Sequence, residues 1–236
     1  MDEMHLPGAP SLFFLFYLLI LLPWQALRSA RRLRGMQQAM ALPDRRRVWG
    51  GTMFIQGAIL LVAWIAGSSF DYPFFRAEGL TLQGAGAAAV ALLFCLGLRV
   101  AVRRLRSEDE RRKLMVYALA PRGLAEGVPW VATVLLASVA EEIAYRGVAV
   151  DILWYSLGSQ AAAVGISALG FALAHSVQGL KSGALIFAIG LVMHALVIVT
   201  GTLVWAMLVH LSFDLIAGIL IAREAARFDA EAAAAG

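Results

Sequence analysis

The chain has 236 residues, of which 61% are hydrophobic and only 15% are charged. A soluble domain is closer to half apolar and a quarter charged, and a domain of this size cannot bury such an excess of apolar surface in its own core. The composition therefore excludes an ordinary soluble protein and indicates a chain that lives in a lipid bilayer. The net charge of +4 sits in short basic runs between apolar stretches. Such runs are typical of cytoplasmic loops, so we expect no nucleic-acid partner.

Seven apolar stretches approach the roughly 20 residues that a helix needs to cross a bilayer. Their expected ranges are 10–27, 48–68, 80–102, 128–152, 158–178, 183–200 and 202–222. We therefore predict an all-α fold, a polytopic transmembrane helix bundle of about seven spans. Residues 1–125 would form N-terminal spans 1–3 with basic cytoplasmic loops, residues 126–222 a four-helix core, and residues 223–236 a short C-terminal tail.

Basic residues cluster in every second connection. They gather in the segments 28–47 and 103–126, at Lys181, and after the last span, whereas the segment 69–79 carries only Arg76. With seven spans, all these clusters fall on one side of the membrane. The positive-inside rule then predicts the N-terminus outside and the C-terminus in the cytoplasm. The abundance of Ala, Gly and Arg favours a bacterial source, and hence the bacterial inner (cytoplasmic) membrane.

Ionisable side chains occur inside the last four spans, whereas the interiors of the first three hold essentially none. Such a residue at the centre of a membrane helix costs about 2.5 to 3.5 kcal/mol on translocon scales, so each is a candidate for function. The set consists of Glu141, Glu142, Arg146, His175, His194, His210 and Asp214. We therefore expect any chemistry to lie in the C-terminal half.

The spacing of the first cluster separates its two carboxylates. Glu142 and Arg146 are one helical turn apart and can pair, whereas Glu141 points about 100° away. Glu141 would then remain available as a general base. The alternative is that Glu142 and Arg146 form a purely structural ion pair. His194 has no partner at helical spacing, which favours an interhelical hydrogen bond.

Three motifs follow one another, each in its own apolar span: E-E-x-x-x-R at 141–146, F-x-x-x-H at 171–175 and H-x-x-x-D at 210–214. Together they resemble the CPBP family of intramembrane endopeptidases. This family is the CAAX prenyl protease and bacteriocin-processing group, also called the Abi family. The resemblance covers about residues 125–222. It implies a protease whose catalytic core is the four-helix segment, and whose partners are the bilayer and a peptide or protein substrate with a membrane-proximal cleavage site.

The resemblance also implies a role for each motif residue. Glu141 and His175 would activate a water that attacks a peptide carbonyl, while His210 and Asp214 would stabilise the oxyanion or hold a metal. Glu142 and Arg146 would form the supporting shell. An ionised carboxylate repels an oxyanion, so Asp214 must be protonated, hold His210 as a cation, or bind metal.

No cofactor is certain from the sequence. The absence of an H-E-x-x-H motif and of cysteine ligands favours a metal-free glutamate mechanism. A divalent metal such as zinc on Glu141, His175, His210 and Asp214 is the alternative. Ideal helix geometry places Glu141 and His210 near the midplane and His175 closer to the cytoplasmic end.

Two other functions remain open. Buried ionisable residues also build ion-coupled transporters, although the chain lacks the paired broken helices of inverted repeats. A non-catalytic immunity or binding protein of the same fold would keep the bundle without needing Glu141. Substrate identity is not encoded in the motifs; a bacterial source favours leader or C-terminal sorting peptides over prenylated ones.

Overall fold

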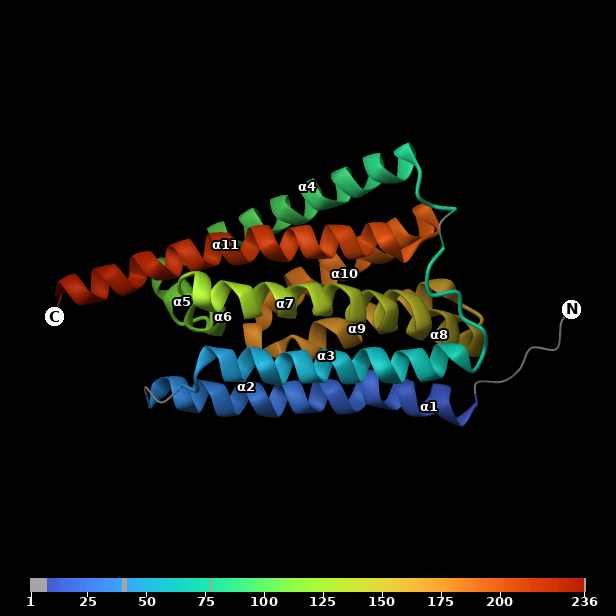
Figure 1. Cartoon of the computed structure of the whole chain (residues 1–236), viewed down its shortest axis with the longest axis horizontal. Helices are drawn as coiled ribbons and strands as arrows, with labels where there is room; N and C mark the ends of the chain where they lie inside the picture. The colour runs from blue at the N-terminus through green and yellow to red at the C-terminus, as the bar shows by residue number, and fades with distance from the viewer. Residues whose placement is uncertain (1–7, 40–41, 77, 236) are drawn as a thin grey trace, which may run out of the picture.

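The computed structural model describes residues 8–39, 42–76 and 78–235, and it contains helices but no strand within those ranges (Figure 1). The α-helices are α1 Ala9–Phe16, α2 Leu22–Gln38, α3 Arg45–Ser68, α4 Leu82–Arg104, α5 Glu108–Arg112, α6 Met115–Ala118, α7 Leu124–Glu141, α8 Ala149–Leu157, α9 Gln160–Ala174, α10 Leu180–Thr200 and α11 Leu203–Ala235. The π-helical segments Tyr17–Leu21 and Glu142–Val148 join α1 to α2 and α7 to α8. A 3₁₀ turn, Ser176–Gln178, follows α9.

Six helical rods in the described part of the chain are long and apolar enough to cross a membrane. They are Ala9–Gln38, Arg45–Ser68, Leu82–Arg104, Leu124–Leu157, Leu180–Thr200 and Leu203–Ala234. The predicted all-α polytopic bundle is thereby confirmed. The predicted span at 158–178 is shorter than expected, because α9 has only 15 residues. At 1.5 Å per residue it reaches about 22 Å, less than the roughly 30 Å of a hydrocarbon core.

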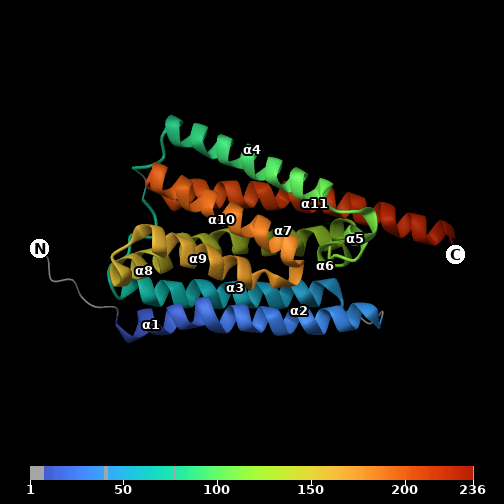
Figure 2. The ribbon, with the colours of Figure 1, turned by 180° about the vertical axis from the view of Figure 1, so that it is seen from behind.

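The connections fall at two opposite ends of the bundle. The end of α2, the short helices α5 and α6, and the end of α11 lie together at one end, on the left of Figure 1. The turns after α3, α8 and α10 lie at the other end, and Figure 2 shows the same division from behind. All the predicted basic clusters therefore share one end, here called the basic end. Its cytoplasmic location remains a prediction.

Two of the basic segments are more helical than predicted. The arginines of 28–34 lie on α2, which continues to Gln38, and α11 runs on through the predicted tail to Ala235. Between them, α5 carries a Glu108–Arg112 ion pair of 2.6 Å at i, i+4 spacing. Arg112 also pairs with Glu231 of α11, so ion pairs fasten the basic end.

Glycines form the tight turns at the opposite end. Gly158, with φ of 66°, ends α8, and Gly201, with φ of 69°, ends α10. Both are left-handed positions that glycine adopts without steric cost. Ser159 then caps α9 by accepting a hydrogen bond from the backbone N–H of Ala162, which is the usual role of serine at a helix start. These turns make α8–α9 and α10–α11 antiparallel pairs.

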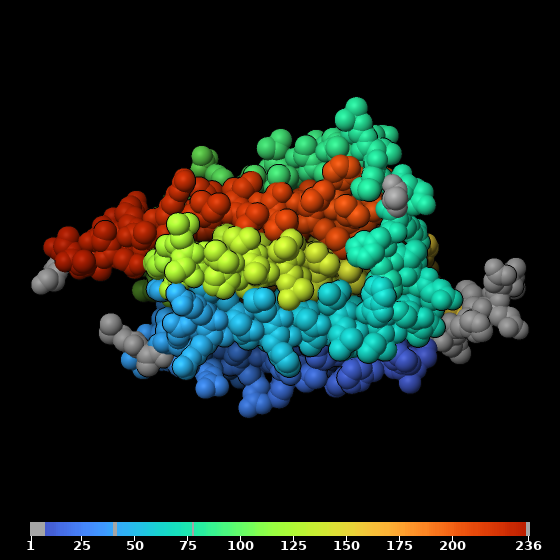
Figure 3. Space-filling model, in the orientation of Figure 1, coloured from blue at the N-terminus to red at the C-terminus, as the bar shows by residue number. Residues whose placement is uncertain are grey.

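The rod formed by α7 and α8 is the centre of the bundle. Every residue from Ala140 to Val150 is buried, which is the pattern of a helix enclosed on all sides. On the face shown in Figure 3, α7 is visible as a strip between α3 and α11. Tyr145 packs edge-on against Phe171 of α9, with ring centroids 5.1 Å apart. The first motif therefore lies in the most enclosed part of the described chain.

Candidate active site

The first motif lies on the π-helical segment at the centre of the rod. Glu141 ends α7, and Glu142–Val148 is wound as a π-helix, a local widening that is frequent at functional sites. Arg146 Nη1 lies 3.2 Å from Glu142 Oε1, and both side chains are almost fully buried. The guanidinium also stacks 4.0 Å above the ring of Phe171. The structure therefore pairs Arg146 with Glu142, and Glu141 is left outside this ion pair, as the spacing predicts.

His210 on α11 lies among three carboxylates. Its Nδ1 is 2.7 Å from Glu142 Oε1, a hydrogen-bond distance. Its Nε2 is 3.5 Å from Asp214 Oδ2 and 3.8 Å from Glu141 Oε2. The first and third motifs are thus joined through one imidazole, which faces Glu142 with one nitrogen and the remaining two acids with the other.

His175 is held at the end of α9 by its own helix. Its Nδ1 is 2.8 Å from the carbonyl oxygen of Phe171. Because a carbonyl can only accept, Nδ1 carries the hydrogen, and Nε2 of the neutral ring has a free lone pair. That Nε2 lies 3.9 Å from Glu141 Oε2. The same carboxylate oxygen therefore faces both histidines.

The depth predicted for His175 is wrong, and the short length of α9 explains why. Glu141 stands 16 residues before the end of α8 at Leu157, and His175 stands 15 residues after the start of α9 at Gln160. At 1.5 Å per residue the two arms of this antiparallel pair have nearly equal lengths, about 23 Å. His175 therefore ends level with Glu141 instead of nearer the basic end.

Gln56 on α3 contributes to the cluster and was missed by sequence reasoning. Its Nε2 donates a hydrogen bond of 2.5 Å to Glu141 Oε1, and the residue is only 6% exposed. The expectation that the chemistry lies only in the C-terminal half is therefore incomplete. The available signal was an amide side chain in the middle of the apolar run 48–68.

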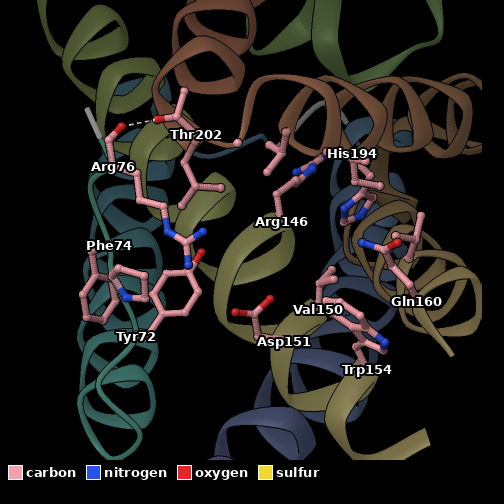
Figure 4. A pocket seen from close by; sticks show the side chains of 16 residues that line it. Tyr72, Phe74, Arg76, Arg146, Val150, Asp151, Trp154, Gln160, His194 and Thr202 are labelled. Carbon is pink, nitrogen blue, oxygen red and sulfur yellow. Dashed lines mark hydrogen bonds between the residues drawn. The ribbon is translucent and has the colours of Figure 1, made fainter. Parts of the chain in front are cut away.

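His194 on α10 does not show the predicted interhelical hydrogen bond at Nε2. The side chain is 2% exposed, and its Nε2 has no partner among the described residues. It lies beside Arg146 of the first motif (Figure 4).

The four predicted metal ligands do not form a metal site as they are placed. Two ligands of a tetrahedral zinc, each at about 2.0–2.1 Å from the ion, would be about 3.3 Å apart. Glu141 Oε2 is 3.9 Å from His175 and 3.8 Å from His210. Asp214 Oδ2 is 3.5 Å from His210 Nε2. Within the described ranges no three His, Cys, Asp or Glu side chains are arranged to hold an ion.

The cluster consists of a buried carboxylate that faces two histidines within an apolar helix bundle. Such groups can act as general acids and bases. Residues 124–216 match the family model Rce1-like, described as type II CAAX prenyl endopeptidase Rce1-like. This match supports the assignment of the protein to the CPBP/CAAX protease family, which the three motifs predict. The matched segment contains all three motifs, and the six long apolar helices are those of an integral membrane protein. No curated protein and no solved structure gives a significant match.

Proposed function

We propose that the protein is an intramembrane endopeptidase that uses a glutamate-activated water. The observation that carries this proposal is the position of Glu141 Oε2, which is 3.9 Å from His175 Nε2 and 3.8 Å from His210 Nε2. Polar atoms at such separations are commonly bridged by a water molecule. A water at this point would touch a general base and two imidazoles at once.

Glu141, His175 and Gln56 then have different roles toward the attacking water. Glu141 takes a proton from the water as oxygen attacks the peptide carbonyl, and later delivers it to the leaving amine. His175 Nε2 has a free lone pair and accepts a hydrogen bond from the second hydrogen of the water, which stays on the oxygen. Gln56 occupies Glu141 Oε1, which keeps the other carboxylate oxygen directed at the water.

His210 is proposed to act as an imidazolium that binds the oxyanion. Three carboxylates surround the ring and Arg146 compensates only one of them, so a positive charge on His210 reduces their mutual repulsion. Nδ1–H donates to Glu142, and Nε2–H is available for the developing oxyanion. Asp214 supports the cation from the outer side. Among the three roles considered for Asp214, the geometry favours the one that holds His210 as a cation.

The side chains of the cluster differ in exposure, and Asp214 is the most exposed of them. The side chain of Glu142 is fully buried and that of Glu141 is 7% exposed. His175 is 26% and Asp214 37% exposed. Since Asp214 follows His210 along α11 toward the basic end, we infer that the site opens there. By the positive-inside rule this is the cytoplasmic side, with the N-terminus outside.

We propose a substrate with a cleavage site near that membrane surface, and a leader or C-terminal sorting peptide if the source is bacterial. The test is cleavage of two probes by the protein in liposomes, a farnesylated CAAX peptide and an unprenylated membrane-anchored leader peptide. Cleavage of either probe that is lost in Glu141→Gln supports the proposal. Correctly inserted protein that cleaves no membrane-anchored peptide, but carries pH-driven flux, would point to a transporter instead.

The contact from α3 leads to a prediction for Gln56. Replacing Gln56 with Leu removes a buried hydrogen bond to a carboxylate, which is worth about 1.5–3 kcal/mol. We expect kcat to fall about 10- to 100-fold, measured as single-turnover cleavage. Gln83→Leu, an exposed site on α4, is the matched control and should cleave normally. Wild-type kcat in folded Gln56→Leu would show that the contact does not serve catalysis.

The spacing of the donor atoms leads to a prediction about metal. We expect cleavage to continue at an unchanged rate after prolonged treatment with EDTA or 1,10-phenanthroline. In the proposed mechanism Glu141 activates the water without a metal ion. The measurement is the initial rate before and after chelation. A rate that disappears on chelation and returns with stoichiometric zinc would contradict the metal-free mechanism.

A further inference from the structure

A cavity lies beyond Arg146, at the end of the bundle opposite the basic loops. Its volume is about 210 Å³, and it is lined by α8, α9, α10, the start of α11 and the loop that follows α3 (Figure 4). None of the residues proposed to bind the reacting peptide lines it. It is therefore a separate compartment that shares only Arg146 with the catalytic cluster.

Two buried polar side chains reach this cavity without satisfying their hydrogen-bonding capacity. Arg146 is 3% and His194 2% exposed. Among the described residues, Arg146 Nε and Nη1 and His194 Nε2 have no hydrogen-bond partner, although Nη1 remains in the ion pair with Glu142. In Figure 4 the two side chains lie side by side at the cavity wall. Buried polar groups of native proteins are nearly always satisfied, so a pair of unsatisfied ones at a cavity indicates a missing partner.

The charges around the cavity indicate the sign of that partner. Arg76 lines it from the exposed loop after α3, and Asp151 is the single carboxylate in the lining. Glu142, which pairs with Arg146, does not line the cavity, so its lining contains two guanidinium groups and one carboxylate. Burial, and to a smaller extent the nearby Asp151, raises the pKa of the Tyr72 hydroxyl. The Tyr72 side chain in the cavity lining is therefore uncharged. An anionic ligand would accept hydrogen bonds from the unsatisfied Arg146 guanidinium.

We propose that this cavity binds a monocarboxylate, either a free carboxylic acid or the C-terminal carboxylate of a short peptide, which enters from the end opposite the basic loops. A planar carboxylate matches the donor geometry of Arg146, and His194 Nε2 is a further donor in its N–H tautomer. The indole of Trp154 and the ring of Tyr72 line the cavity and would contact an apolar substituent on the acid. Asp151 disfavours a second carboxylate through like-charge repulsion.

The test uses the full-length protein in detergent and measures the midpoint of thermal unfolding, which requires no proteolytic activity. The probes are 3-phenylpropionate and the free-acid tripeptide Ala-Ala-Phe, each compared with its neutral amide. At ten times Kd, an acid that occupies the cavity should raise Tm by about 3 °C, while its amide should leave Tm unchanged. The acid with the lower apparent Kd shows whether the natural ligand is a free carboxylic acid or the C-terminus of a peptide.

Variants locate the effect in the cavity. Arg76→Gln changes an exposed loop side chain, and His194→Leu removes the unsatisfied imidazole; each should raise the apparent Kd for the acid at least about tenfold. Asp151→Asn should lower it. Arg104→Gln, an exposed arginine at the basic end, is the matched control and should behave as wild type. The proposal is overturned if neither acid shifts Tm, if the amides shift it equally, or if Arg76→Gln binds the acids as the wild type does.

Discussion

Replacing Glu141 with Gln is expected to lower kcat by about 100- to 10,000-fold, the range that general-base catalysis contributes in enzymes. The amide has nearly the shape of the carboxylate but cannot take a proton from water. Glu141 is 6% exposed and receives a hydrogen bond from Gln56. The measurement is the single-turnover rate of peptide cleavage by reconstituted protein.

The control for this substitution separates chemistry from folding. Glu110→Gln changes an exposed carboxylate at the basic end that pairs with Lys181, and it should retain the wild-type rate. Glu141→Gln should keep a thermal midpoint close to that of the wild type, because Glu141 lies outside the buried Arg146–Glu142 ion pair. A Glu141→Gln protein that cleaves at the wild-type rate would remove Glu141 from the mechanism.

Replacing Arg146 with Met is expected to produce the largest loss of stability. It leaves the fully buried Glu142 carboxylate without its cation, and breaking a buried ion pair in this way costs about 3–5 kcal/mol. His210 still hydrogen-bonds to Glu142, which favours the lower end of that range. For a chain of this length, we expect the thermal midpoint to fall by roughly 10 °C.

A double variant tests whether the unpaired charge causes that loss. In Glu142→Gln/Arg146→Met no buried charge is left alone at this pair, so the thermal midpoint should recover a large part of the loss. Arg104→Met, at an exposed position, should change the midpoint little. A double variant as unstable as Arg146→Met would show that the guanidinium matters for its packing on Phe171 more than for charge.

The order of polar motifs along the chain predicted much of this site. Glu141, His175, His210 and Asp214 were predicted from their type and from their place inside apolar spans. The structure connects them through distances of 3.5 to 3.9 Å. Ionisable groups in lipid are costly enough to be gathered together, so their clustering follows from physical chemistry alone. The division between the two glutamates followed from helical spacing and agrees with the Arg146–Glu142 pair.

Features that depend on helix packing were not predictable in the same way. Gln56 reaches Glu141 across 85 residues, and nothing in the spacing within either helix shows that α3 lies beside α7. The depth of His175 depends on where α9 ends, and composition alone gave a full span at 158–178, longer than the 15 residues of α9. The cavity around His194 joins residues from four helices and a loop, and a single histidine without a sequence partner gave no sign of it.

The central claim is that Glu141 directs a water molecule onto a peptide carbonyl, and isotope incorporation tests it most directly. Wild-type and Glu141→Gln proteins in liposomes are incubated with a membrane-anchored peptide in water enriched in ¹⁸O, and the products are analysed by mass spectrometry. We predict that the wild type releases a product whose new C-terminal carboxylate carries one ¹⁸O atom, and that Glu141→Gln releases none. Equal release of the labelled product by both proteins, or no cleavage by the correctly inserted wild type, would contradict the claim.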